Sequence, residues 1–191
     1  MDHAEAKKLL RKEFIQKRMF LSAMERMVLS GAIANRIVAL EEFAAAGMIA
    51  AYAADDYEVN LRGVIDFALR HNKPVALPFY DAEKKIYKLK MIRDFQRDMC
   101  TGKYNLLEPQ AELPDALPPE DTLWLMPGVA FDSCGTRLGR GGGFYDRMLE
   151  DAPGCRIGVF YQCQYSSVLL PCSEHDQTLT MAVTEEKLYK F

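Results

Sequence analysis

Residues 126–149 read MPGVAFDSCGTRLGRGGGFYDRML, and this order predicts a buried strand, a glycine-rich loop and a helix. A short apolar run that ends at Met126 precedes the loop, and an amphipathic run follows it. Glycines let backbone N–H groups approach an anion, and a helix N-terminus adds partial positive charge. Arg137 and Arg140 carry planar cations that suit phosphate oxygens. The stretch therefore predicts a polyphosphate-binding loop.

Asp146 closes this loop, and an acid at such a position can hold the Mg²⁺ that accompanies a nucleoside triphosphate. The alternative is that the glycines only form a tight turn and the arginines are solvated. The loop is not a Walker A motif, because Phe144 and Tyr145 follow the last glycine in place of Lys-Ser/Thr. A dinucleotide fingerprint beginning at Gly139 also fails, since Phe144 stands where its last glycine should be.

Short apolar segments alternate with amphipathic ones along the chain, which predicts a single α/β domain over residues 1–191. We expect a three-layer sandwich, with a mainly parallel sheet flanked by helices. The expected helices are 2–19, 22–46, 60–70 and 143–151, and the expected strands are 48–53, 74–78, 85–92, 123–126, 156–161 and 181–184. Ser22 and Glu25 predict a capping box at the second helix, and 109–119 is expected to be irregular.

Sheets of this class bind ligands beyond the carboxyl ends of their strands. The segments that follow Ala53, Leu77 and Met126 should therefore converge on one site.

Composition narrows the classes of function. The 191 residues are 49% hydrophobic and 27% charged, with a net charge of −3, which argues against nucleic acid as the main partner. The charged start resembles no signal peptide, and no apolar run is long enough to span a bilayer, so we expect a cytoplasmic protein that does not bind membranes. The five cysteines form no C-x-x-C pair and predict reduced thiols.

The segment Pro127-Gly-Val-Ala-Phe-Asp132, together with residues 137–146, resembles the signature of the 5-formyltetrahydrofolate cyclo-ligase family, also called 5,10-methenyltetrahydrofolate synthetase. The resemblance extends over the whole chain. It implies an ATP- and Mg²⁺-dependent ligase of folate one-carbon metabolism. Such an enzyme converts 5-formyltetrahydrofolate to 5,10-methenyltetrahydrofolate and releases ADP and phosphate, after phosphorylation of the formyl oxygen.

The resemblance also implies roles for individual residues. The residues implied in catalysis are Arg137, Arg140 and Tyr145. Those implied in nucleotide binding are Lys7, Lys8, Arg11, Arg137, Leu138, Gly139, Arg140, Gly141, Gly142, Gly143, Phe144 and Tyr145. Glu58 is implied in folate binding, with Ala53 in the pocket wall, and Asp146 and Asp176 are implied in metal binding. Tyr80 and Tyr104 could add aromatic surface for the folate rings or could simply belong to the core. From the residues alone, Lys7 and Arg11 could equally form a solvated basic face, and Glu58 could belong to a solvated acidic turn.

Two positions depart from the family pattern: Phe144 stands where many members have tyrosine, and Gly142 where some have lysine. Two other functions are considered. A sugar-phosphate isomerase or CoA-transferase-like enzyme could use a similar sheet, but would need a base or nucleophile that is not evident. A non-catalytic nucleotide- or folate-binding homologue would be expected to lose Asp146, Asp176 or the arginines. Small-molecule substrates and a monomer are expected, although the sequence does not fix the oligomeric state.

Overall fold

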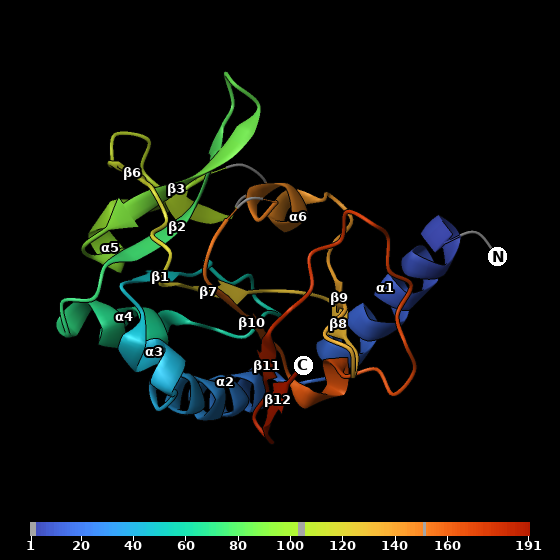
Figure 1. Ribbon diagram of the computed structural model, residues 1–191. Coiled ribbons are helices and arrows are strands. Elements are labelled where there is room, and N and C mark those ends of the chain that lie inside the picture. The colour runs from blue at the N-terminus through green and yellow to red at the C-terminus, as the bar shows by residue number, and fades with distance from the viewer. Residues whose placement is uncertain (1–2, 103–105, 151) are drawn as a thin grey trace.

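The computed structural model describes residues 3–102, 106–150 and 152–191, and its centre is an eight-stranded sheet (Figure 1). The strand order is β12-β11-β10-β7-β1-β2-β3-β6. Five neighbouring strands, from β11 to β2, are parallel, and the antiparallel strands lie at the two edges. The strands are β1 (Met48–Ala50), β2 (Val75–Asp81), β3 (Ile86–Ile92), β6 (Asp115–Ala116), β7 (Thr122–Met126), β10 (Cys155–Val159), β11 (Met181–Val183) and β12 (Leu188–Lys190).

Helices α2 (Ala23–Val38), α3 (Glu41–Ala45) and α4 (Arg62–Arg70) cover one face of the sheet, whereas α6 (Phe144–Met148) lies on the other (Figure 1). On the first face, Ile33 and Phe43 join a buried cluster with strand residues such as Leu123. On the second, Trp124 and Leu149 belong to a separate cluster. The α/β class and the mainly parallel sheet flanked by helices are confirmed.

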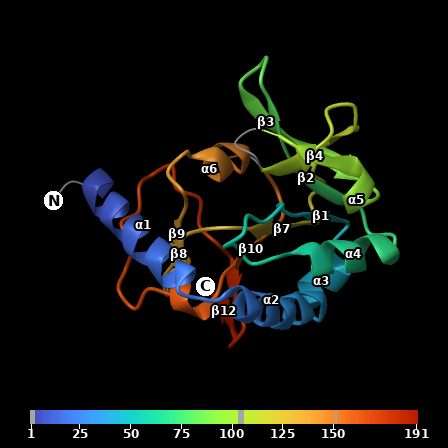
Figure 2. The same cartoon turned by 180° about the vertical axis from the view of Figure 1, so that it is seen from behind.

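The N-terminal helix α1 (His3–Met19) stands apart from these layers, beside a small ribbon made of β8 (Ala130–Phe131) and β9 (Arg137–Leu138) (Figure 2). Its buried Phe14 packs in a cluster with Val129 and Leu138. The apolar side of α1 therefore fixes the helix against the segment that leads into the glycine-rich loop.

Several expectations about local structure are wrong. The helix expected over 22–46 breaks at Ala39 and Leu40, where Leu40 has an extended backbone. The break lets α3 turn so that Phe43, 2% exposed, packs against Phe67 at a ring distance of 6.0 Å. The expected direct passage from strand to glycine-rich loop is also wrong, because the β8–β9 ribbon intervenes.

The remaining elements are short and were not expected: α5 (Phe95–Asp98), β4 (Met99–Thr101), β5 (Leu107–Pro109), β6, β12 and the 3₁₀ turn η2 (Gln162–Gln164). Strand β6 lies inside the segment expected to be irregular. The capping box of α2 is confirmed, since the Ser22 hydroxyl accepts from the Glu25 N–H and the Glu25 carboxylate accepts from the Ser22 N–H. No helix in the described residues is long and apolar enough to cross a membrane.

Candidate active site

The glycine-rich loop joins β9 to α6 and depends on glycine at two positions. Gly141 has a φ of +98° and Gly143 a φ of +61°, which is the left-handed region that other residues rarely adopt. Gly142 differs, since a Cβ built there would meet nothing within 4 Å. A Cβ would therefore fit at 142 without a steric conflict.

The loop forms one wall of a cavity of about 350 Å³. Helix α1 forms another wall, because the Arg11 Nε donates to the Gly139 carbonyl at 2.8 Å and Lys7 lines the same space. Lys8 is exposed and is not among the lining residues. The cavity lining consists of Lys7, Arg11, Glu58, Pro127, Gly128, residues 137–146 and Asp176. Every residue implied in nucleotide binding except Lys8 is therefore brought together.

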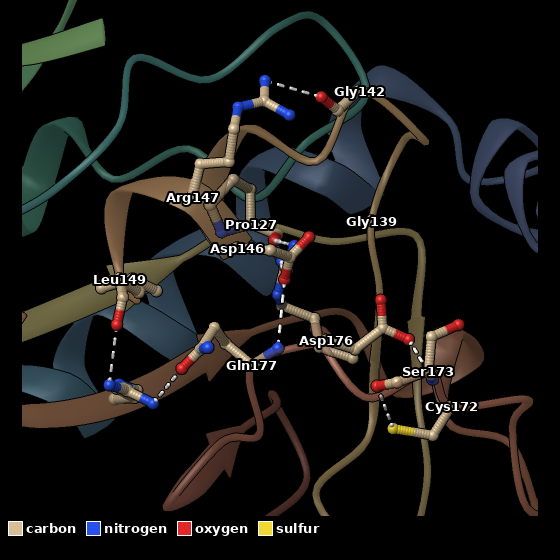
Figure 3. Close-up of polar contacts among 12 residues, drawn as sticks. Pro127, Gly139, Gly142, Asp146, Arg147, Leu149, Cys172, Ser173, Asp176 and Gln177 are labelled. Atoms are coloured by element: carbon tan, nitrogen blue, oxygen red, sulfur yellow. Dashed lines mark hydrogen bonds and ion pairs between the residues drawn. The ribbon is translucent and has the colours of Figure 1, made fainter. Parts of the chain in front are cut away.

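The two acids implied in metal binding line this cavity, and each already contacts a cation. Asp146 Oδ1 accepts from Arg137 at 2.9 Å and from the Gln177 backbone N–H at 3.2 Å. Asp176 Oδ2 pairs with Lys7 and accepts from the Ser173 backbone N–H at 2.7 Å. Figure 3 shows both acids beside Gln177. Because Gln177 follows Asp176 directly and its N–H donates to Asp146, the two carboxylates lie in the same part of the cavity wall.

These acids fit a magnesium ion that is shared with phosphates. The described residues contain no group of three or more His, Cys, Asp or Glu that could hold a metal alone. Mg²⁺ is commonly bound by one or two carboxylates, with substrate phosphates and water completing its shell. Among the described residues, Oδ2 of Asp146 and Oδ1 of Asp176 accept no hydrogen bond, so one oxygen of each acid has free acceptor capacity.

Arg137 is more enclosed than an arginine in an exposed loop would be. Its side chain is 3% exposed, and its guanidinium pairs with Asp146 and lies 5.5 Å from the centre of the Tyr145 ring. The residue lines the cavity but also acts as the buried counter-ion of Asp146. Its substitution should therefore affect folding as well as any contact with phosphate.

Arg140 turns toward a different part of the protein. Its guanidinium donates to Asp55 Oδ2 and to Glu58 Oε1, the latter at 2.9 Å. Burial raises the pKa of the Glu58 carboxyl above its ordinary value, although the charge of Arg140 opposes this effect. Burial would also raise the pKa of Asp55, but its hydrogen bond to Arg140 holds that pKa below the ordinary value. Arg140 therefore carries the counter-charge for both acids.

A second cavity, of about 390 Å³, adjoins the first and has an aromatic lining. Its walls include Ala53 after β1, Tyr80 on β2, and Phe144 and Tyr145 on α6. The cavities share Glu58, Pro127, Arg140, Phe144 and Tyr145. Segments following β1, on β2 and following β7 thus converge, as expected from the sheet. Tyr104, a candidate for folate binding, lies outside the described residues.

Sequence reasoning missed Tyr87, which lines the second cavity, and the contact that Asp55 makes with Arg140. Tyr87 on β3 lies against Phe144, with ring centres 3.7 Å apart and planes at 66°, and Tyr80 pairs with it across the β2–β3 ladder. The alternation of β3 and its hairpin register could have identified it. Asp55 was assigned only to an acidic turn, and no local signal predicts its contact with Arg140, which is 85 residues away.

The arrangement places a polar, glycine-rich cavity directly beside an aromatic one. The first offers cations, backbone N–H groups and two acids, which suit a polyphosphate with its metal ion. The second offers ring surfaces and a carboxylate, which suit a planar heterocycle with N–H donors. A group could therefore pass from a phosphate chain to a heterocyclic substrate across their common wall.

Comparison with known proteins agrees with this geometry. The sequence pattern of the 5-formyltetrahydrofolate cyclo-ligase family matches residues 3–185. The 5-formyltetrahydrofolate cyclo-ligase of Haemophilus influenzae is 30% identical over 166 residues, which are 85% of this chain and 89% of that protein. That of Escherichia coli K12 is 29% identical over 181 residues, covering 92% and 98%.

A solved structure shows the same likeness in three dimensions. The NMR structure of Aquifex aeolicus 5,10-methenyltetrahydrofolate synthetase is 32% identical and has a TM-score of 0.84, covering 96% of this chain and 92% of that one. The chain belongs to the 5-formyltetrahydrofolate cyclo-ligase family.

Proposed function

We propose that this protein is an ATP-dependent ligase that converts 5-formyltetrahydrofolate to 5,10-methenyltetrahydrofolate, with release of ADP and phosphate. The observation that carries the proposal is the common wall of the two cavities, which Glu58, Arg140 and Tyr145 help to form. Membership of the family supports the same reaction. ATP would occupy the glycine-lined cavity, and the folate ring system the aromatic one.

The first step moves the γ-phosphoryl group to the formyl oxygen. The bond between the γ-phosphorus and the bridging oxygen breaks, ADP leaves, and a bond forms between phosphorus and the formyl oxygen. Such transfer depends on positioning and on stabilisation of charge. The loop N–H groups, Lys7 and Arg11 surround the space where phosphates would lie. Arg140 belongs to the wall that the two cavities share, where the transferred group would pass.

The second step closes the five-membered ring. The other folate nitrogen attacks the activated carbon and loses its proton, and phosphate leaves as the carbon–oxygen bond breaks. The protein must hold the two nitrogens near that carbon, because proximity lowers the barrier to ring closure. Glu58 and the ring surfaces of Tyr80, Tyr87 and Phe144 line the cavity that would hold the heterocycle. Tyr145 lines both cavities and is placed to contact the reacting group.

Asp146 and Asp176 are the residues that would hold Mg²⁺, which when bound would neutralise charge on the phosphate chain. If both acids serve one metal–nucleotide unit, Asp146→Asn and Asp176→Asn should each raise the Mg²⁺ concentration needed for half-maximal rate. The loss of turnover in the double variant should then be smaller than the losses of the two single variants combined, because the effects of groups that act as a unit are not additive. Additive losses with no change in Mg²⁺ requirement would assign the acids to separate tasks.

The alternative functions receive less support. Neither an isomerase nor a CoA-transferase-like activity is favoured by the family membership. A non-catalytic homologue was expected to lose the acids or arginines of the loop, whereas all of them line the first cavity. We also propose that residues 1–191 act as one domain, that the protein is a monomer, and that it works in the cytoplasm on small molecules.

The decisive experiment incubates the protein with ATP, Mg²⁺ and 5-formyltetrahydrofolate and follows the absorbance of the methenyl product. Product should appear only when all three are present, and ADP should form in equal amount. ATP hydrolysis without product, at the same rate with and without the folate, would refute the proposal.

A further inference from the structure

The ion pairs of Arg140 suggest that the two substrates influence each other's binding. Arg140 belongs to the loop that lines the first cavity, yet its guanidinium pairs with two acids of the turn after β1. One of those acids, Glu58, lines both cavities. The same arginine can therefore contact the acids or a phosphate. While its Nη2 is paired with both acids, its charge is largely neutralised and attracts a phosphate less strongly.

Both oxygens of Glu58 are engaged in this state. Oε1 accepts from Arg140 at 2.9 Å, and Oε2 accepts from the Asp55 backbone N–H at 3.2 Å. A heterocycle that donates N–H groups to both oxygens of Glu58 therefore competes with these donors for the carboxylate. The side chain of Arg140 is 48% exposed, so it is the donor that can leave without disturbing the backbone of the turn.

Asp55 holds Arg140 through one oxygen only. Its Oδ2 pairs with Arg140, whereas its Oδ1 accepts from the backbone N–H groups of Tyr57 at 2.9 Å and Glu58 at 2.8 Å. The two oxygens thus have separate tasks: one closes the turn, and the other draws the arginine toward the folate cavity. Once a ligand occupies Glu58, the ion pair with Asp55 alone holds Arg140 near the turn. Exposed ion pairs of this kind are weak.

A second arginine, Arg18, lies near Asp55 and Glu58 and would still supply positive charge to both acids if Arg140 moved away. Arg18 on α1 is 5% exposed, and its Nε has no hydrogen-bond partner among the described residues. It lines a small cavity together with Asp55 and Arg140, and its charge acts on both Asp55 and Glu58. The acids would therefore not lose all positive charge if Arg140 moved toward phosphate.

We propose that Asp55 is a positioning residue that holds Arg140 on the folate side in the free enzyme, so that folate bound at Glu58 releases Arg140 to ATP. This inference rests on the proposed function. Binding of the two substrates must then be positively coupled, and by linkage each must raise the affinity for the other by the same factor.

Calorimetric titration of a non-hydrolysable ATP analogue with Mg²⁺, with and without saturating 5-formyltetrahydrofolate, tests the coupling. For the unmodified protein, the folate should tighten analogue binding by about fivefold or more. Asp55→Asn keeps the oxygen that closes the turn and removes the charge that holds Arg140. In this variant only Glu58 still pairs with Arg140, so the analogue should bind without folate more tightly than it binds the unmodified protein without folate, and the effect of folate should be smaller.

Asp56→Asn is the matched control, because Asp56 is exposed, neighbours Asp55 and loses the same charge. Asp56→Asn should bind the analogue with the same affinity as the unmodified protein, and folate should tighten that binding by the same factor. Asp55→Ser, whose hydroxyl can also accept from the turn, provides a second variant if the first is poorly folded. An unchanged effect of folate in Asp55→Asn, or weaker analogue binding, would overturn the inference. Binding of both ligands without coupling in the unmodified protein would also overturn it, whereas failure to bind either ligand would reject the proposed function itself.

Discussion

Replacing Arg137 with glutamine should destabilise the fold, in contrast to substitution of an exposed arginine nearby. The Arg137 side chain is 3% exposed and pairs with Asp146 Oδ1 at 2.9 Å, while the Asp146 side chain is 22% exposed. Removing one partner of a fully buried pair costs about 3–5 kcal/mol, whereas exposed pairs are worth about 0–1 kcal/mol. Because one end of this pair is buried and the other partly exposed, we expect a loss of roughly 2–3 kcal/mol.

For a chain of this size, each kcal/mol lowers the melting temperature by about 2–4 °C, so the expected decrease is roughly 4–12 °C. The measurement is thermal unfolding of the ligand-free protein, followed by circular dichroism or calorimetry. Arg147→Gln is the matched control, because Arg147 is exposed and, within the part of the chain that the structure describes, its guanidinium donates only to the Gly142 carbonyl. Exposed substitutions usually change stability by less than about 0.5 kcal/mol.

A double-mutant cycle isolates the pair itself. Arg137→Gln combined with Asp146→Asn should cost at least about 1 kcal/mol less than the two single changes added together, since the contact can be lost only once. Equal melting temperatures for Arg137→Gln and Arg147→Gln, or full additivity in the cycle, would refute the reasoning. Arg137 would then be a solvated loop residue whose only task is to contact the nucleotide.

Three further predictions follow from individual contacts. Lys7→Gln should raise the KM for ATP several-fold. Lys8→Gln, on the exposed side of the same helix, should leave the KM unchanged. Equal effects of the two changes in steady-state kinetics would contradict the placement of Lys7. Burial would raise the pKa of the Asp176 carboxyl, but Lys7 and a backbone N–H hold it below its ordinary value. Asp176 should thus stabilise the fold above about pH 4 and lose this contribution as the pH falls further, so urea unfolding of Asp176→Asn and the unmodified protein should differ at neutral pH and converge in acid. Gly142→Ala should leave the melting temperature nearly unchanged, whereas Gly141→Ala should lower stability by about 1 kcal/mol or more, because Gly141 has a positive φ and Gly142 does not.

Local patterns predicted much of the secondary structure. The capping box of α2 joins residues three apart, so Ser22 and Glu25 contain all the information that it needs. The glycine-rich loop was likewise evident, because positive φ at Gly141 and Gly143 is a property of those positions. By contrast, the break at Ala39 depends on how Phe43 packs against Phe67, and helical periodicity alone gives no sign of it.

The sequence by itself predicted most residues that line the first cavity, because the loop, the acids and the basic N-terminal helix stand in a pattern that resembles the family signature. The tertiary structure decided the partner of each charge. Arg140 pairs with Asp55 across 85 residues, and Lys7 with Asp176 across 169. Such pairs form because strand order in the sheet brings distant segments to one edge, and no local propensity encodes that order. Two arginines three residues apart therefore differ in environment, one buried against Asp146 and the other held at the wall between the two cavities.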